Sequence, residues 1–160
     1  MKEKGTKTKF MLRAIELSQV HMRAGHGGPF GCVIVKKGKI IGEGWNQVTS
    51  KKDPTAHAEV MAIRQACQKI KHFELKGCQV YTSCEPCPMC LAALYWARVD
   101  KIYFANTRKD AARIGFDDDF IYKEIKLSLK HRTIPVVQIC QAQATPVFDE
   151  WQSTPDKMRY

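Results

Sequence analysis

The chain has 160 residues, of which 44% are hydrophobic and 26% charged, a composition ordinary for one globular domain. Apolar residues nowhere run uninterrupted for the roughly 18 positions that a membrane helix needs, so we expect no membrane association. The formal net charge of +10 would suit a nucleic-acid partner, but the excess lies mainly in the Lys-rich start and in dispersed single residues. We therefore expect a solvated basic surface and no nucleic-acid partner.

The first ten residues, MKEKGTKTKF, contain lysines with no apolar block and small-residue cleavage site after them. This pattern predicts no secretory signal, and we expect a cytoplasmic location. Further along, apolar spacing predicts helices over residues 8–25, from residues 54–57 onward and over 88–98. Strands are expected as a hairpin over 29–45, and over 78–83, 101–106 and 136–140.

This order of elements begins with strands and then alternates helix and strand. It predicts an α/β fold, a three-layer α-β-α sandwich with a mixed five-stranded sheet, as a single domain over residues 1–160. The last residues, 144–160, contain two prolines and several aromatic residues. A disordered tail would seldom carry Phe148, Trp151 and Tyr160, so we expect a docked irregular or short helical segment.

Two half-motifs indicate a metal site. Cys87 and Cys90 form a C-x-x-C pair at a helix start marked by Pro88, where the helix dipole favours thiolate. His57 and Glu59 lie at the start of the preceding helix, and both helix starts are expected at the same sheet edge. One imidazole and two thiolates give Zn²⁺ three protein ligands and leave the fourth position for water, as in catalytic zinc sites. Glu59 can then carry protons.

Cys84 completes a C-x-x-C-x-x-C run and raises two alternatives from a different class of protein. The run could seed an iron–sulfur cluster, or Cys84 could close a structural zinc site. The iron–sulfur interpretation lacks a fourth cysteine and leaves His57 unused, and a closed zinc site leaves Glu59 without a role. We predict that Cys84 packs near the metal and does not bind it. The remaining cysteines are scattered, and seven is an odd number, so a secreted disulfide framework is not expected.

The residues His57-Ala58-Glu59 and Pro86-Cys87-Pro88-Met89-Cys90 match the H-x-E and P-C-x-x-C signature of zinc deaminases. The sequence resembles the cytidine-deaminase-like superfamily and, within it, the bacterial guanine deaminases. The resemblance covers nearly the whole chain and includes the segments GGPFG (27–31), DPTAHAEVMAIR (53–64), YTSCEPCPMCLAALYWAR (81–98), GFDDDFIYKEI (115–125) and the C-terminal tyrosine.

The resemblance implies one Zn²⁺ per subunit and hydrolysis of guanine to xanthine and ammonia. It implies that Asn46 and Asp118 hold the base, that Phe30 and Trp96 wall the pocket, and that Tyr160 helps to close it. The closing tail, residues 144–160, is implied to come from a second subunit, which predicts a homodimer. A tRNA adenosine deaminase, and a deaminase of guanosine or of another aminated purine or triazine, stay open as alternatives.

Overall fold

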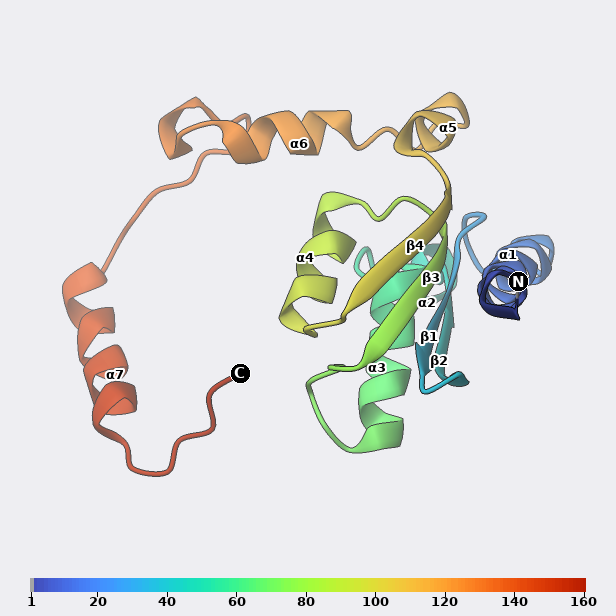
Figure 1. The fold of residues 1–160 in the computed structure, drawn as a ribbon. Coiled ribbons are helices and arrows are strands. Elements are labelled where there is room, and N and C mark those ends of the chain that lie inside the picture. Colours follow the sequence, from blue (N-terminus) through green and yellow to red (C-terminus); the bar gives the residue numbers. More distant parts are fainter. Residues whose placement is uncertain (1) are drawn as a thin grey trace. The chain divides into compact units, whose positions relative to one another are not determined.

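The computed structural model describes residues 2–160, with side chains from residue 7 onward. The chain forms two compact units, Met1–Asp118 and Asp119–Tyr160, which are described separately (Figure 1). The first unit contains, in chain order, α1 (Lys2–Arg23), β1 (Gly31–Lys36), β2 (Lys39–Trp45), α2 (Val48–Lys51), α3 (Ala58–Ile70), β3 (Cys78–Cys84), α4 (Pro88–Trp96), β4 (Lys101–Asn106) and α5 (Arg108–Arg113). The second contains α6 (Asp119–Lys126), a 3-10 turn η1 (Leu129–His131) and α7 (Gln141–Ser153).

The four strands form one mixed sheet in the order β2-β1-β3-β4. β1 lies antiparallel to both β2 and β3, and β4 is parallel to β3. The predicted hairpin is confirmed, with Lys37 and Gly38 at its turn, both with positive φ. The first helix begins earlier than predicted, at Lys2 rather than near residue 8.

The prediction of a fifth strand is wrong for the chain over residues 2–160. Residues 136–140 are irregular and lie between η1 and α7 in the second unit. A β-branched run such as Val136-Val137 favours a strand only where a partner edge satisfies its backbone hydrogen bonds. The sheet itself ends at β4, which pairs on one side only with β3 within the described part of the chain.

Helices cover both faces of the sheet and give the predicted three layers (Figure 1). On one face, α1 buries Phe10, Ala14 and Leu17 against Val33 and Tyr81. On the other face, α3 and α4 pack against a second cluster that includes Cys32, Ile34, Val80, Leu94 and the alanines of α3. Residues of β3 alternate between these faces. Val80, Thr82 and Cys84 therefore share the face that α3 and α4 cover.

Two glycines on β2 let α3 approach the sheet closely. A Cβ atom at Gly44 would lie 2.1 Å from the carbonyl oxygen of Ala58, and one at Gly42 would lie 2.5 Å from that of Ala62. The facing residues of α3 are small as well, since Ala58, Ala62 and Ala66 are fully buried. Backbone therefore packs against backbone here, which fixes the first turn of α3 relative to the strands.

In the second unit, the helices expose much of their apolar surface. Phe120, Ile121 and Ile125 on α6 are exposed, and so are Phe148 and Trp151 on α7. The prediction for residues 144–160 allowed a short helix, and α7 is helical through Ser153 with Pro146 inside it. No helix over the described residues is long and apolar enough to cross a membrane.

Candidate active site

The cluster of metal-ligating side chains is built on two helix starts. His57 is the N-cap residue of α3 and Cys87 is the N-cap residue of α4, both with extended backbone, and Pro88 occupies the first turn of α4. Cys90 follows one turn later on the same helix. At a helix start the unpaired N–H groups and the positive end of the dipole favour an anionic side chain. The local sequence therefore sets the positions of the two sulfurs and places Cys87 where a thiolate is favoured.

The structure brings His57, Cys87 and Cys90 together, with one ligand atom from each lying within 4.8 Å of the others. His57 Nδ1 lies 3.6 Å from Cys87 Sγ and 3.5 Å from Cys90 Sγ. A tetrahedral zinc ion, with Zn–S near 2.3 Å and Zn–N near 2.0–2.1 Å, separates sulfur from nitrogen by about 3.6 Å. The cluster thus has the spacing and the donor set that Zn²⁺ requires.

The electrostatics of the cluster favour one thiolate. Hydrogen bonds from the Cys90 thiol and from His57 lower the pKa of Cys87 to about 4. The pKa of Cys90 is raised, because its thiol donates a hydrogen bond to Cys87 and because it is buried. The same contact with Cys87 raises the pKa of His57. Cys87 is therefore ready to bind a cation, and binding would displace the protons that Cys90 and His57 hold.

Glu59 lies in the first turn of α3, two residues after His57, and is 6% exposed. Its Oε1 accepts a hydrogen bond of 3.0 Å from Thr82 Oγ1 on β3. Burial raises the pKa of Glu59 above its usual value. A carboxyl group whose pKa is raised holds a proton more readily than a solvated one, which suits a general acid–base catalyst.

Cys84 lies outside the cluster. Its Sγ points to the carbonyl oxygen of Thr107, at 3.7 Å, and burial raises the pKa of its thiol to about 11. This thiol is directed at a backbone carbonyl group and is not a member of the cluster formed by His57, Cys87 and Cys90. Among residues 2–160, the group able to hold a metal has three members, one fewer than a closed structural zinc site needs.

Asn46, which is predicted to hold the substrate, directly follows β2 and is buried. Its Oδ1 accepts hydrogen bonds from the backbone N–H groups of Gly28, at 3.2 Å, and Val48, at 3.3 Å. Two donors on Oδ1 fix which way the amide faces. The Oδ1 atom of Asn46 therefore holds the loop backbone at Gly28 and Val48 in place. The NH₂ group of the same side chain is left to donate a hydrogen bond to a substrate.

Phe30 and Asp118, two more predicted site residues, lie in the same unit as the cluster. Phe30 meets Phe116 edge to face, with ring centroids 4.9 Å apart. Burial, and then the charge of Cys87, raise the pKa of Asp118. Phe116 was not predicted, although it belongs to the quoted segment GFDD.

Trp96, another predicted pocket residue, is not brought to the cluster. Trp96 is the last residue of α4, about 12 Å along the helix axis from the end that carries Cys87, and it is 68% exposed. Its role as a pocket wall has no support within one chain. Tyr160 lies in the second unit. Thr82, which contacts Glu59, was not predicted as a site residue either. The alternation of side chains along the strand CQVYTSC was the sequence pattern that could have placed it on the face of the sheet that α3 covers.

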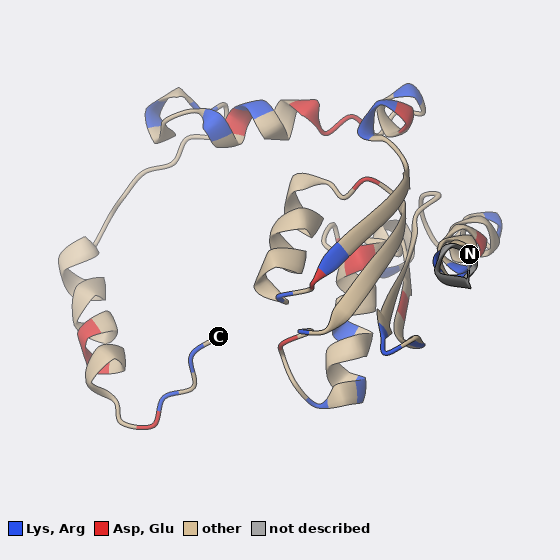
Figure 2. Ribbon diagram, in the orientation of Figure 1, with Lys and Arg blue, Asp and Glu red and all other residues tan. Residues whose placement is uncertain are grey.

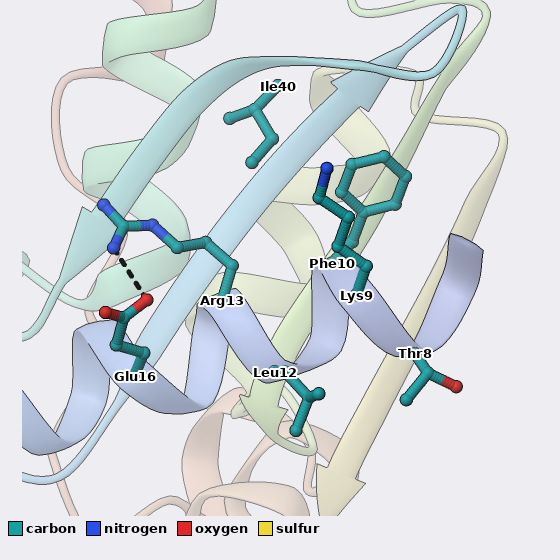
Figure 3. Close-up of a pocket in the computed structure, with 7 residues that line it drawn as sticks. All are labelled: Thr8, Lys9, Phe10, Leu12, Arg13, Glu16 and Ile40. Carbon is teal, nitrogen blue, oxygen red and sulfur yellow. Dashed lines mark hydrogen bonds and ion pairs between the residues drawn. The ribbon is translucent and has the colours of Figure 1, made fainter. Parts of the chain in front are cut away.

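A groove of about 600 Å³ lies on the opposite face of the sheet, between α1 and β2 (Figure 3). Phe10, Leu12 and Ile40 line it together with Arg13, whose guanidinium pairs with Glu16. The sheet separates this groove from the helix starts of α3 and α4. It contains no part of the metal-ligating cluster.

A buried carboxylate beside an open three-ligand zinc site, on a mixed sheet between helical layers, defines a zinc-dependent hydrolase that acts on C–N bonds. The chain belongs to the family described as the cytidine and deoxycytidylate deaminase zinc-binding region, whose model matches residues 4–106.

Among its relatives is guanine deaminase of Bacillus subtilis, 51% identical over 151 residues, covering 94% of this chain and 97% of that protein. The X-ray structure of the Bacillus subtilis enzyme superimposes with a TM-score of 0.93 at 50% identity, covering 96% of this chain and 98% of that one. The tRNA-specific adenosine deaminase of Aquifex aeolicus is 47% identical, but over 81 residues, 51% of this chain and 54% of that protein. A protein solved in complex with 2,6-diaminopurine matches with a TM-score of 0.65 at 33% identity, covering 68% of this chain and 61% of that one.

Proposed function

We propose that this protein hydrolyses guanine to xanthine and ammonia. The cluster of His57, Cys87 and Cys90 beside buried Glu59 is the observation that carries the deaminase chemistry. The choice of guanine follows from the guanine deaminase of Bacillus subtilis, which is similar over 94% of the chain, including the second unit. The similarity to the Aquifex aeolicus tRNA-specific enzyme covers only about half of it.

His57, Cys87 and Cys90 would hold the zinc ion, one per chain. When bound, zinc acts as a Lewis acid and lowers the pKa of water at its fourth position. The two thiolates offset the charge of the metal, so the site depends on a nearby group to move protons. Glu59 is that group.

Glu59 takes a proton from the attacking water and delivers it to N3 of guanine while the water oxygen bonds to C2. It then passes the second proton of the water to the exocyclic amine, and the bond between C2 and that nitrogen breaks. Water has then supplied the new oxygen at C2, the proton on N3 and the third hydrogen of ammonia. Burial favours this cycle because it raises the pKa of Glu59, so that the carboxyl group holds a proton more readily than a solvated one.

The polar residues around the cluster suit a purine edge that carries both acceptors and donors. The NH₂ group of Asn46 donates to an acceptor such as a purine carbonyl, and Asp118 accepts from ring N–H groups. Phe30 and Phe116, which touch edge to face, supply an aromatic surface for a flat base. The match to a protein solved with 2,6-diaminopurine is in keeping with a purine in the pocket.

Part of the basic charge of the first unit lies away from this site. Lysines gather at the β1–β2 hairpin and at the far end of α3, as Figure 2 shows, whereas His57 caps the opposite end of α3. Asp117 and Asp118 follow α5, and a nucleic-acid backbone would be repelled by acidic groups at the pocket. A free base therefore fits the site better than an anticodon loop.

Ammonia release from guanine, guanosine, adenosine and cytosine, measured with zinc-loaded protein, tests the proposal. We expect turnover of guanine with at least tenfold lower kcat/KM for the other three. An RNA anticodon stem-loop containing adenosine is included as a fifth substrate. Inactivity on guanine together with conversion of this adenosine to inosine would refute the proposal and favour the tRNA-editing alternative.

We also propose that the protein works as a cytoplasmic homodimer in which residues 144–160 complete the domain of the second subunit. The apolar side chains of α6 and α7 need a partner surface. Within the described residues of the first unit, the outer edge of β4 has no strand beside it, and the β-branched run Val136-Val137 of a second copy has a composition that suits such an edge. A reducing compartment keeps the zinc-binding thiols available.

Mixing two variants that are each impaired in guanine turnover tests the exchange. One is Glu59→Ala with an intact tail, and the other retains Glu59 but ends at Ser153. In an exchanged dimer, the intact tail of the first variant covers the competent site of the second, and activity returns after the chains are unfolded and refolded together. If each tail folds on its own chain, the mixture stays as inactive as its components, which would refute the exchange.

A further inference from the structure

The hydrogen bond between Thr82 and Glu59 has no part in binding the metal. Thr82 Oγ1 donates to Glu59 Oε1 at 3.0 Å, and the two side chains are 1% and 6% exposed. Thr82 lies inside the sheet, paired with Cys32 on β1 and with Phe104 on β4. Its backbone is therefore held from both sides, and its hydroxyl group is a fixed point beside the carboxyl group.

Water cannot easily replace this donor. Cys32, opposite Thr82 on the same face, is fully buried, and α3 covers this part of the sheet. The Cys90 thiol also contacts Glu59, but a sulfur that binds a metal carries no proton to donate. With zinc bound, the donors that remain to the carboxyl group are the Thr82 hydroxyl and the backbone N–H of Glu59 itself, and of these two the hydroxyl joins the carboxyl group to the sheet.

We propose that Thr82 is a positioning residue for Glu59. This proposal rests on the proton-carrying role of Glu59 in the proposed function. The hydroxyl group holds Oε1 against the sheet, so that Oε2 faces the substrate. Glu59 must meet three partners in turn: the attacking water, N3 and the departing amine. A carboxyl group fixed at one oxygen keeps the other within hydrogen-bonding distance of each of them.

Three variants separate this role from a structural one. Thr82→Val removes the hydroxyl group at nearly unchanged size, and Thr82→Ser retains it. Ser83→Ala is the matched control, because Ser83 is the next residue on β3, is buried, and accepts a hydrogen bond from the backbone N–H of Gly31 at 3.0 Å. It faces the α1 side of the sheet and does not contact Glu59.

For each variant, kcat and KM for guanine, zinc content and the unfolding midpoint are measured on zinc-loaded protein. Loss of a hydrogen bond to a charged group corresponds to about tenfold to hundredfold in rate. We expect Thr82→Val to lose kcat by that factor, with KM within about threefold of wild type and one zinc per chain. Thr82→Ser should recover kcat to within about threefold, and Ser83→Ala should lower the unfolding midpoint without a comparable loss of kcat.

An unchanged kcat in Thr82→Val would overturn the proposal, and so would an equal loss of kcat in Ser83→Ala or a loss that follows zinc release. Failure of the proposed function is distinguishable from these outcomes. In that case wild-type protein does not turn over guanine, or Glu59→Gln does so normally. If wild type is active and Glu59→Gln is inactive while Thr82→Val is fully active, only the role of Thr82 is refuted.

Discussion

Gly44 packs against the helix start that positions His57, a proposed zinc ligand, although Gly44 is not itself a member of the metal-ligating cluster. In Gly44→Ala, the new Cβ would lie 2.1 Å from the carbonyl oxygen of Ala58 and 2.5 Å from the nitrogen of Ala62. Real Cβ atoms essentially never approach closer than 3.0 Å. The first turn of α3 must therefore move away from β2 by about 0.9 Å.

This displacement acts on the site because Ala58 lies between His57 and Glu59. Metal–ligand distances tolerate changes of only about 0.2 Å, and displaced or unsupported ligands typically lower metal affinity tenfold to a hundredfold. We expect Gly44→Ala to weaken zinc binding at least about tenfold. Overpacking should also lower the free energy of unfolding by about 1–3 kcal/mol.

Gly31→Ala provides a control with a contact of nearly the same size on the other face of the sheet. Its Cβ would lie 2.2 Å from the carbonyl oxygen of Ala14 on α1. Zinc affinity is measured by competition with a chelating dye, and the free energy of unfolding by urea titration. Both variants should be destabilised, but only Gly44→Ala should lose zinc affinity. Equal zinc affinities in the two variants would refute the view that the packing of β2 against α3 sets the ligand position.

Further variants test the roles of single side chains. Cys87→Ser should lose zinc by metal analysis whereas Cys84→Ser should retain it, because the Cys84 thiol faces Thr107; zinc loss in both would place Cys84 in the site. Glu59→Ala should keep one zinc per chain and lose about 10²-fold to 10⁴-fold in kcat for guanine, and a zinc-free variant would contradict that assignment. Removal of the last residues through Tyr160 should reduce guanine turnover with zinc still bound, and full activity would exclude a closing role for the tail.

The metal-ligating cluster could be predicted from the sequence because each of its parts follows a local rule. Pro88 predicts a helix start, and a helix start favours the thiolate of Cys87. His57 and Glu59 also precede an apolar helical pattern, and helix starts on consecutive crossovers meet at one sheet edge. The first of these rules acts over a few residues, and the second needs only the order of helices and strands along the chain. The three layers and the hairpin followed from periodicity in the same way.

The remaining parts depend on contacts between distant segments. Thr82 contributes through a hydrogen bond to a residue 23 positions earlier in the chain, and Phe116 meets Phe30 across 86 positions. Period-two alternation places Thr82 on the face of Val80 but does not say which helix covers that face. The predicted strand at 136–140 failed for a related reason, since strand propensity describes a residue's fit to a sheet and does not supply the neighbouring edge.

The contact between β2 and α3 depends on the absence of large side chains on both elements. Gly42 and Gly44 on β2 face Ala58, Ala62 and Ala66 on α3, so backbone meets backbone where most helix–sheet contacts use large side chains. An added atom at this contact displaces the backbone of α3 itself, since no flexible side chain lies between the two backbones that could move instead. Truncating a large core residue elsewhere leaves a cavity that lowers stability but can relax locally. Added volume on β2 should therefore impair zinc binding more than larger losses of volume in the core beneath α1.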